Sequence, residues 1–257
     1  FATCKHLAET QPPWLLKEDK RDAALHGNLK LLKWLRSAGH EFPIEVYANA
    51  ALGGHLEILK LAHRDELRLS LSICYNAARG GNLEALQWAR KNGCPWDHWT
   101  FGEAASGGHL EVLQWLRKNE CPWNEYTCIN AACGGHLEAL QWLRANGCPW
   151  DESTCFYAAV NGRLEVLQWA HTNGCPSFLK VCIVAARCGY LDMLKWARAN
   201  GCPWDDFVRV VAAENGHLEI LKWLREIGYP MDIKVRNEAV ANGHLKVVEW
   251  LDKIGCP

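Results

Sequence analysis

The amino-acid sequence predicts an all-α solenoid built from pairs of antiparallel helices. The first observation is a stretch, GHLEVLQWLRKNECPW at residues 108–123, that returns at an unvarying period of 27 residues. A fixed period of that length is typical of stacked repeat arrays. The second is that no run of β-branched residues alternates with polar ones, so strands are not expected. Clear copies begin at Gly81, Gly108, Gly135, Gly162 and Gly189, and weaker ones at Gly27, Gly54, Gly216 and Gly243.

One unit, residues 151–176, shows why each repeat is predicted to be two helices. Asp151 is a good N-cap, and the helix that follows, here called helix A, is expected to stop at Asn161-Gly162. A second helix, helix B, is expected to start at once, because Leu164, Leu167, Trp169 and Ala170 form an apolar stripe of helical spacing. It ends at Asn173-Gly174, and Pro176 blocks continuation.

Two kinds of residue recur at fixed places and are predicted to form the core. A pair of small residues in helix A, such as Ala131-Ala132, lets that helix lie close to its neighbours. A Trp in helix B buries a large apolar area, on the order of 150 to 250 Å². A second group, in the loop after Cys-Pro, is expected to cover the end of the stack. The helix B residues are Trp34, Trp88, Trp115, Trp142, Trp169, Trp196, Trp223 and Trp250, and the loop residues are Trp96, Trp123, Trp150 and Trp204.

Composition and charge exclude several classes of protein. Apolar residues make up 49% and charged residues 22% of the chain, which is enough material for a continuous core. The formal charge is −1, with no basic stripe for a phosphate backbone, so nucleic acid is not expected as a partner. No apolar run is long enough for a membrane span and no signal peptide is recognisable, which predicts a soluble chain. The sequence starts at Phe1, so a targeting signal or further repeats can lie outside it.

The thirteen cysteines raise the alternative of a disulfide scaffold. Repeats of this kind stack about 10 Å apart, whereas a disulfide needs Cα atoms within about 7 Å. The column of cysteines at one repeat position is therefore not expected to bridge to itself, and the total is odd. Free thiols predict an intracellular reducing compartment, cytoplasm or nucleus or an organelle matrix. The column is Cys94, Cys121, Cys148, Cys175, Cys202 and Cys256.

The segment AACGGHLEALQWLRANG at residues 131–147 resembles the ankyrin repeat. The matching features are the Ala-Ala pair, a Gly-His junction between short helices, the apolar stripe and a terminal Asn-Gly. The usual ankyrin unit has 33 residues and opens helix A with T-P-L-H; this one has 27 and offers Tyr126-Thr127-Cys128-Ile129. The missing residues fall where ankyrin proteins carry a β-turn finger. The resemblance, closest to a short, Trp-rich variety in algal, oomycete and giant-virus proteins, implies an ankyrin-like solenoid with shortened loops.

The resemblance also divides the chain. Residues 15–257 are predicted to hold about nine repeats of 27 residues. Residues 1–14 form a lead-in segment, interpreted as a cap or as the end of a preceding domain.

The residue types that often carry chemistry do not form a catalytic or metal-binding pattern. His55, His109, His136, His217 and His244 share the position that opens helix B, which suits a side chain satisfying free groups at helix ends. Cys121, Cys128 and Cys133 are a dense cluster without close CxxC pairs, so zinc is not expected. No positioned nucleophile and base and no phosphate-binding loop is recognisable. We therefore expect no enzymatic activity, no cofactor, no metal and no small-molecule substrate.

The positions that vary between repeats are more informative about binding, because a scaffold keeps its core positions fixed. In ankyrin arrays the corresponding face of helix A lines the concave groove, so the resemblance implies a binding surface at these positions. Trp99, Tyr126 and Tyr157 are residue types typical of interaction hot spots, and Arg187 and Glu214 would add polar selectivity. The candidate partner-binding residues are Trp99, Glu103, Tyr126, Asn130, Tyr157, Arg187, Phe207 and Glu214.

The sequence thus predicts a non-catalytic scaffold that binds a protein partner through the concave helix A face. Rigid presentation would keep the ordering entropy lost on association small. Two alternatives remain open. The N-terminal FATCKHLAE faintly resembles the last helix of an F-box, which would make the chain a substrate adaptor of a ubiquitin ligase. The loop aromatics are also consistent with a permanent structural subunit of a large assembly.

Overall fold

The structure is a computed structural model that describes residues 20–64, 69–175, 180–203 and 206–256. Every regular element in these ranges is a helix, as the sequence predicts. The chain divides into two compact units, and one boundary between them along the sequence falls within the helix α10 (Glu125–Gly134). The first unit holds the described residues up to Ala131 together with Glu138–Cys148, and the second holds Ala132–Leu137 together with the described residues from Pro149 onward.

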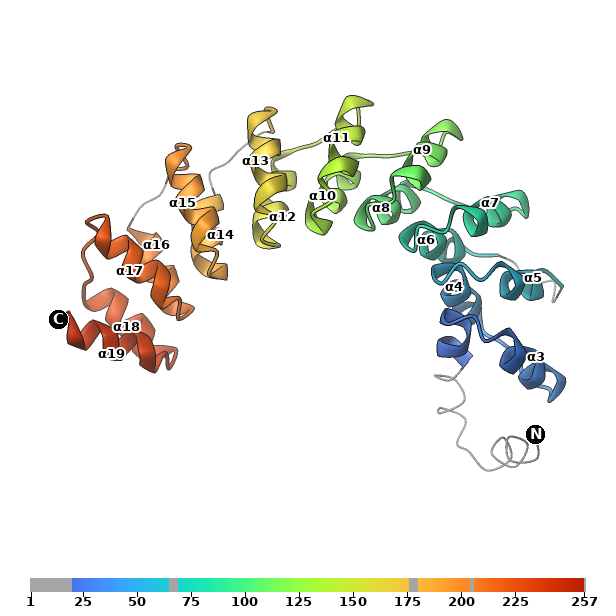
Figure 1. The fold of residues 1–257 in the computed structure, drawn as a ribbon, viewed down its shortest axis with the longest axis horizontal. Helices are drawn as coiled ribbons and strands as arrows, with labels where there is room; N and C mark the ends of the chain where they lie inside the picture. The colour runs from blue at the N-terminus through green and yellow to red at the C-terminus, as the bar shows by residue number, and fades with distance from the viewer. Residues whose placement is uncertain (1–19, 65–68, 176–179, 204–205, 257) are drawn as a thin grey trace. The chain divides into compact units, whose positions relative to one another are not determined.

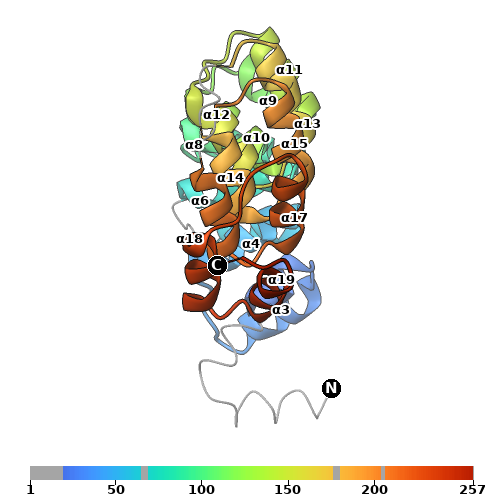
Figure 2. The same ribbon diagram turned by 90° about the vertical axis from the view of Figure 1, so that its left-hand side faces the viewer.

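Helix A and helix B alternate along each unit. The first unit contains α3 (Leu29–Ser37), α4 (Ile44–Leu52), α5 (Leu56–Arg64), α6 (Leu71–Arg79), α7 (Leu83–Lys91), α8 (His98–Ser106), α9 (Leu110–Lys118), most of α10 and α11 (Leu137–Ala145). The second contains α12 (Glu152–Val160), α13 (Leu164–Thr172), α14 (Val181–Cys188), α15 (Leu191–Ala199), α16 (Phe207–Glu214), α17 (Leu218–Glu226), α18 (Ile233–Ala241) and α19 (Leu245–Lys253). In the second unit the A helices α12, α14, α16 and α18 lie in one row and the B helices α13, α15, α17 and α19 in another (Figures 1 and 2).

Local sequence sets where each helix begins and ends. Asp97 begins α8 by accepting a hydrogen bond from Trp99 N at 2.9 Å, and Thr100 Oγ1 accepts one from Asp97 N at 3.3 Å. The side chain of Asp151 caps α12 by accepting a hydrogen bond from Ser153 N at 2.9 Å. Only residues 92–97 separate α7 from α8, which confirms the short connection between helix B and the next helix A that the sequence predicts.

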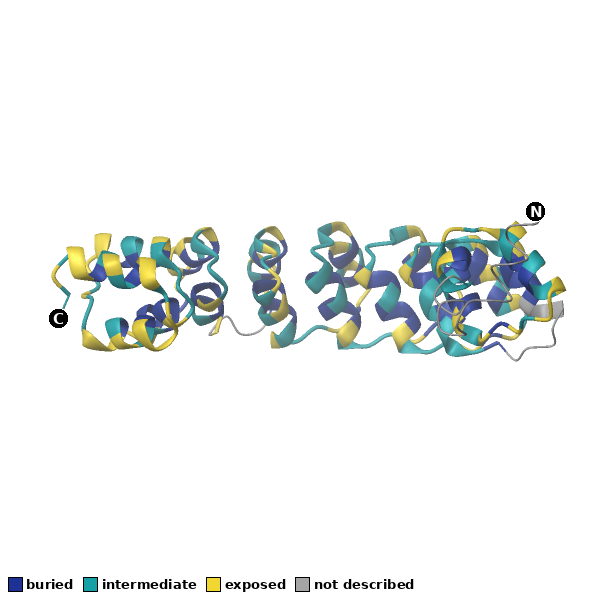
Figure 3. Cartoon of the chain, turned by 90° about the horizontal axis from the view of Figure 1, so that it is seen from below, coloured by how far each residue is buried: buried dark blue, intermediate teal, exposed yellow. Residues whose placement is uncertain are grey.

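Small and branched apolar residues fill the space between helices, so buried residues line the inner sides of the helices (Figure 3). The Ala pairs are completely buried, as at Ala104 and Ala105, and neighbouring A helices such as α6 and α8 pack against one another there. In helix B the core residue is a leucine such as Leu113, whose side chain is 0% exposed. Truncating a leucine of this kind to alanine typically costs about 2 to 5 kcal/mol.

The Trp residues of helix B are only partly buried, so their prediction as core residues was too strong. The reason is that loop tryptophans share the same space. Trp96 stands edge to face with Trp115, with ring centroids 5.5 Å apart, and Trp150 does so with Trp169 at 5.9 Å. The loop residues thus contact the helix B Trp of the following repeat, which corrects the expectation that they cover the end of the stack. Trp204 lies outside the described residues.

The residues that open helix B connect successive repeats, which confirms their expected role at helix ends and adds the identity of their partners. His109 Nε2 donates to the carbonyl of Arg79, the last residue of helix A in the preceding repeat, at 2.9 Å. His217 donates to Arg187 O and His244 to Glu214 O, both at 2.8 Å. Where the sequence has Asn82 instead, its amide donates to Leu52 O at 2.7 Å. The recurring residues of the motif therefore hold one repeat to the next.

The cysteine of the Cys-Pro position joins the end of several repeats to the start of helix A in the same repeat. The buried thiol of Cys121 donates to the carbonyl of Asp97, the N-cap of helix A in the same repeat, at 3.4 Å. Burial raises the pKa of Cys121 to about 12, which keeps this thiol protonated near neutral pH. Equivalent bonds join Cys94 to Ser70 O at 3.1 Å and Cys175 to Asp151 O at 3.4 Å. The cysteines that the structure describes are free thiols.

Candidate functional site

In the first unit the structure brings two candidate residues together. Trp99 lies in the first turn of α8 and Tyr126 in the first turn of α10. Their ring centroids are 5.7 Å apart with 32° between the ring planes. The side chains are 45% and 48% exposed, so each ring keeps a large part of its surface open to a partner. Exposed large aromatic side chains of this type are enriched in interaction hot spots.

The chain around Trp99 explains why this aromatic pair is well positioned. Asp97 and Thr100 form the capping box at the start of α8. They flank His98 and Trp99 in the sequence, so the backbone that carries Trp99 is held at both ends. Tyr75 adds a bond from the preceding repeat, because its hydroxyl donates to Asp97 Oδ2 at 2.7 Å. Burial, reinforced by the Asp97 carboxylate, raises the pKa of Tyr75, so the hydroxyl stays protonated and keeps donating.

Two polar candidate residues accompany the pair at the other end of the same helices. Glu103 is partly buried, and its Oε2 lies 3.9 Å from Arg79 Nε of the preceding repeat. Asn130 lies against Gly102, where an added Cβ would come within 2.7 Å of the Asn130 amide nitrogen. Both residues therefore contact a neighbouring repeat, and neither is as exposed as Trp99 or Tyr126.

The candidate residues of the second unit lie on the exposed parts of its A helices. Tyr157 on α12 is 43% exposed and stands edge to face with its neighbour Phe156 at 5.4 Å. Phe207, at the first position of α16, is 49% exposed. Arg187 and Glu214 lie in the last turns of α14 and α16 with exposed side chains, and their carbonyls accept the histidine bonds of the next repeat.

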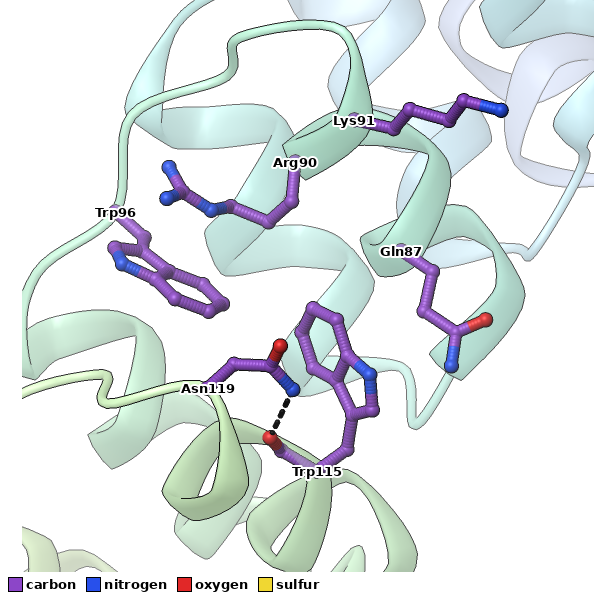
Figure 4. Close-up of a pocket in the computed structure, with 6 residues that line it drawn as sticks. All are labelled: Gln87, Arg90, Lys91, Trp96, Trp115 and Asn119. Atoms are coloured by element: carbon purple, nitrogen blue, oxygen red, sulfur yellow. Dashed lines mark hydrogen bonds between the residues drawn. The ribbon is translucent and has the colours of Figure 1, made fainter.

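Sequence reasoning missed a second surface, at the C-terminal end of the B helices. Six residues of the first unit line a cavity of about 350 Å³ that contains the Trp96–Trp115 pair. The Trp column was interpreted as core, so the partly buried indoles were not considered as a site. The sequence did contain a signal for this surface. Helix B ends on the basic residues Arg90 and Lys91, and the loop that follows carries a second Trp, Trp96. The lining residues are Gln87, Arg90, Lys91, Trp96, Trp115 and Asn119 (Figure 4).

The described residues were searched for metal-binding groups and for membrane-spanning helices. Across the described ranges, no group of three His, Cys, Asp or Glu side chains is arranged to hold a metal ion. A search of the same residues finds no helix long and apolar enough to cross a membrane.

Comparisons with known proteins agree with this architecture. The repeated helix pairs, the Gly-His junctions and the buried Ala pairs define a helical repeat solenoid. Residues 73–117 match the family model described as ankyrin repeats (many copies). Among solved structures, the chain is similar to the ankyrin repeat domain of human ASB11, with a TM-score of 0.51 and 19% identity over 62% of this chain and 84% of that one. No curated protein gives a significant match.

The described helices thus form an all-α repeat fold, and residues 73–117 match ankyrin repeats. Ankyrin repeats are generally modules for protein–protein interaction.

Proposed function

We propose that this protein is a protein-interaction scaffold that binds its partner through the exposed side chains of helix A. The observation that carries the proposal is the contact between Trp99 and Tyr126, two large aromatic rings that stay close to half exposed. Neither ring is needed to fill the core, which is formed by the buried alanine and leucine positions. An aromatic pair fixed in this way loses little side-chain entropy on binding.

The proposal includes the wider set of candidate residues. Tyr157, Phe207, Arg187 and Glu214 would contact the partner from the second unit, and Glu103 and Asn130 would border the aromatic pair in the first. We propose that about nine repeats over residues 15–257 form the scaffold, that it needs no cofactor, and that it does not bind nucleic acid. The buried free thiols support a reducing intracellular compartment. The F-box-like stretch and the lead-in segment lie outside the described residues.

The test replaces Trp99, Tyr126 and Tyr157 together with alanine. The native partner is first recovered on the wild-type chain and identified, and its affinity for both proteins is then measured by calorimetry. Truncating hot-spot aromatics typically costs about 2 kcal/mol or more each, so we expect at least a hundredfold loss of affinity.

A matched control replaces exposed apolar residues elsewhere. Ile227 and Leu245 are 43% and 73% exposed and lie at the ends of α17 and α19, outside the proposed face. The double variant Ile227→Ala and Leu245→Ala should bind the partner as the wild type does. Unchanged affinity of the triple variant, with its urea unfolding midpoint intact, would rule out this face as the binding surface.

A further inference from the structure

The side chains around the cavity beside Trp96 make specific contacts with one another, although they do not belong to the buried core. The guanidinium of Arg90 lies over the indole of Trp96, 3.9 Å from the ring centroid, and donates to Cys94 O at 2.6 Å. Trp115 stands across the cavity, and Asn119 lies between the two indoles with its amide donating to Trp115 O at 2.8 Å (Figure 4). Both indoles are only partly buried.

The residues that line this cavity include positively charged side chains and no negatively charged one. Its six lining residues are neutral or cationic, and Lys91 points away from the indoles with an exposed side chain (Figure 4). Arg90 carries five N–H donors, of which the bond to Cys94 O uses one. A basic residue in the last turn also suits the helix dipole. The helix dipole does not explain, however, why two partly buried indoles accompany that basic residue.

The same arrangement occurs one repeat further along the first unit. Arg117 lies over Trp123 at 4.2 Å, and Trp123 stands edge to face with Trp142 at 6.4 Å. Arg117 and Lys118 are the basic residues in the last turn of α9, as Arg90 and Lys91 are in α7. The first unit thus presents two successive sets of cation and indole pair. We call this surface the Arg–Trp edge, defined by Arg90, Trp96, Trp115, Arg117, Trp123 and Trp142.

We propose that the Arg–Trp edge binds an extended acidic polypeptide, which places carboxylates against the arginines and apolar side chains against the indole pairs. Adjacent repeats lie about 10 Å apart. An extended or polyproline chain advances about 3.1 to 3.3 Å per residue, so every third residue meets the same feature of the next repeat. The partner should therefore carry an acidic residue at every third position.

A polypeptide fits this edge better than a nucleic acid does, although both carry negative charge. Arg90 already covers one face of Trp96, which hinders a base from stacking flat on it. Glu120 directly follows Asn119 and has an exposed side chain, so an acidic residue adjoins the cavity residues in the sequence. A phosphate backbone would be repelled at that point, whereas a peptide with spaced carboxylates can pass it.

The test uses a fluorescent peptide of repeated Glu-Leu-Pro triplets, about twelve residues long, whose proline favours an extended chain. Its affinity is measured for the wild type and for the double variant Arg90→Gln and Arg117→Gln. Charge-assisted hydrogen bonds contribute about 1.5 to 3 kcal/mol, so we expect at least a tenfold loss. The matched control is Lys30→Gln and Lys246→Gln, which removes the same charge from exposed first-turn positions of α3 and α19. It should change the affinity less than about twofold.

A second variant keeps the result decisive if loss of the arginines unfolds the chain. The double variant Lys91→Gln and Lys118→Gln leaves both Arg–Trp contacts in place and should lower the affinity for the peptide several-fold. Absence of peptide binding, or equal losses in the Arg90/Arg117 variant and the control, would overturn the proposal. So would tighter binding of a single-stranded oligonucleotide of equal charge.

The two proposed surfaces can be tested separately. The variant Trp99→Ala and Tyr126→Ala should bind the peptide as the wild type does, because these residues do not belong to the Arg–Trp edge. Loss of peptide binding in that variant would instead place the acidic chain on the helix A face and overturn this inference.

Discussion

Two successive repeats of the second unit differ in what lies against their Gly-His junction. At Gly216, between α16 and α17, an added Cβ would lie 2.5 Å from Nδ1 of His244 in the next repeat. At Gly243, between α18 and α19, it would meet no atom of the described residues within 4 Å. Both glycines have positive φ, 73° and 72°, so their backbone conformation is the same and only the neighbour differs.

The leucine that opens helix B shows the same contrast. Leu218 is partly buried, whereas Leu245, one period later, is 73% exposed. Identical motif residues therefore have different environments, because the contacts of this position come from the following repeat. The difference indicates that the Gly of the motif, besides making the left-handed turn within its own helix pair, packs against the His of the following repeat.

The largest expected effect on stability is that of an alanine at Gly216, the junction that His244 of the next repeat covers. Gly216→Ala introduces left-handed strain of about 1 to 2 kcal/mol and an overpacked contact with His244 of about 1 to 3 kcal/mol. We expect a total loss near 3 kcal/mol in the free energy of unfolding, measured by urea denaturation. Gly243→Ala is the matched control and should lose only the strain of about 1 to 2 kcal/mol. Equal losses would show that His244 does not constrain the junction.

An intermediate effect is expected from Arg209, which joins α16 to the start of α18. Its buried guanidinium lies 2.9 Å from Asp232 and 3.3 Å from Asp206, and also donates to Pro230 O at 2.9 Å. Both carboxylates are partly or largely exposed, so they stay hydrated when the arginine is removed. Arg209→Met should therefore lose about 1 to 3 kcal/mol rather than the larger penalty of a fully buried ion pair. No loss of stability would show that the last repeat is held by apolar contacts alone.

The same ion pair predicts a dependence on pH. Desolvation acts to raise the pKa of Asp232, but the N–H groups of Val235 and Lys234 and the Arg209 guanidinium outweigh it, and the pKa is lowered. A lowered pKa in the folded state contributes stability above the unfolded value of about 3.9, which is lost as pH falls through the folded value. The difference in unfolding free energy between wild type and Arg209→Met should shrink below about pH 4. A constant difference down to pH 2 would contradict this assignment.

The smallest effect is expected from the hydrogen bond of His244 to Glu214 O. His244→Ala should lose about 1 kcal/mol, the usual net contribution of one hydrogen bond. His244→Asn is the control, because Asn82 occupies this position in the first unit and donates to Leu52 O. A smaller loss for asparagine than for alanine in urea unfolding would support the inter-repeat bond, and equal losses would argue against it.

The fold was predictable from the sequence because the period, the helix caps and the Ala pairs are all local signals. The capping by Asp151 and the end of α12 at Asn161 follow from residues adjacent in the chain. The partner of His109 was not predictable, because its acceptor is a carbonyl 30 residues away that carries no residue identity. The exposure of the helix B tryptophans was missed for a related reason. A periodic apolar residue predicts burial, but the loop Trp of the preceding repeat takes part of that space.

The candidate site was predictable only as a list of variable positions. That list contains Trp99 and Tyr126, which the structure places in contact, and also Glu103 and Asn130, which lie against neighbouring repeats. Variation between repeats identifies positions outside the core, but it does not show which of them stay exposed once neighbouring repeats stack. Side-chain exposure is what separates these two groups.

The central claim is that the recurring residues hold neighbouring repeats together, which leaves the variable residues for binding. A double-mutant cycle between Gly216 and His244 tests this claim most directly. The free energy of unfolding is measured for Gly216→Ala, His244→Ala and the variant with both changes. Removing the imidazole relieves the contact with the new Cβ, so the double variant should be more stable than the sum of the single losses predicts, by about 1 to 2 kcal/mol. Additive losses within about 0.5 kcal/mol would contradict the account, because the two residues would then not touch across the repeats.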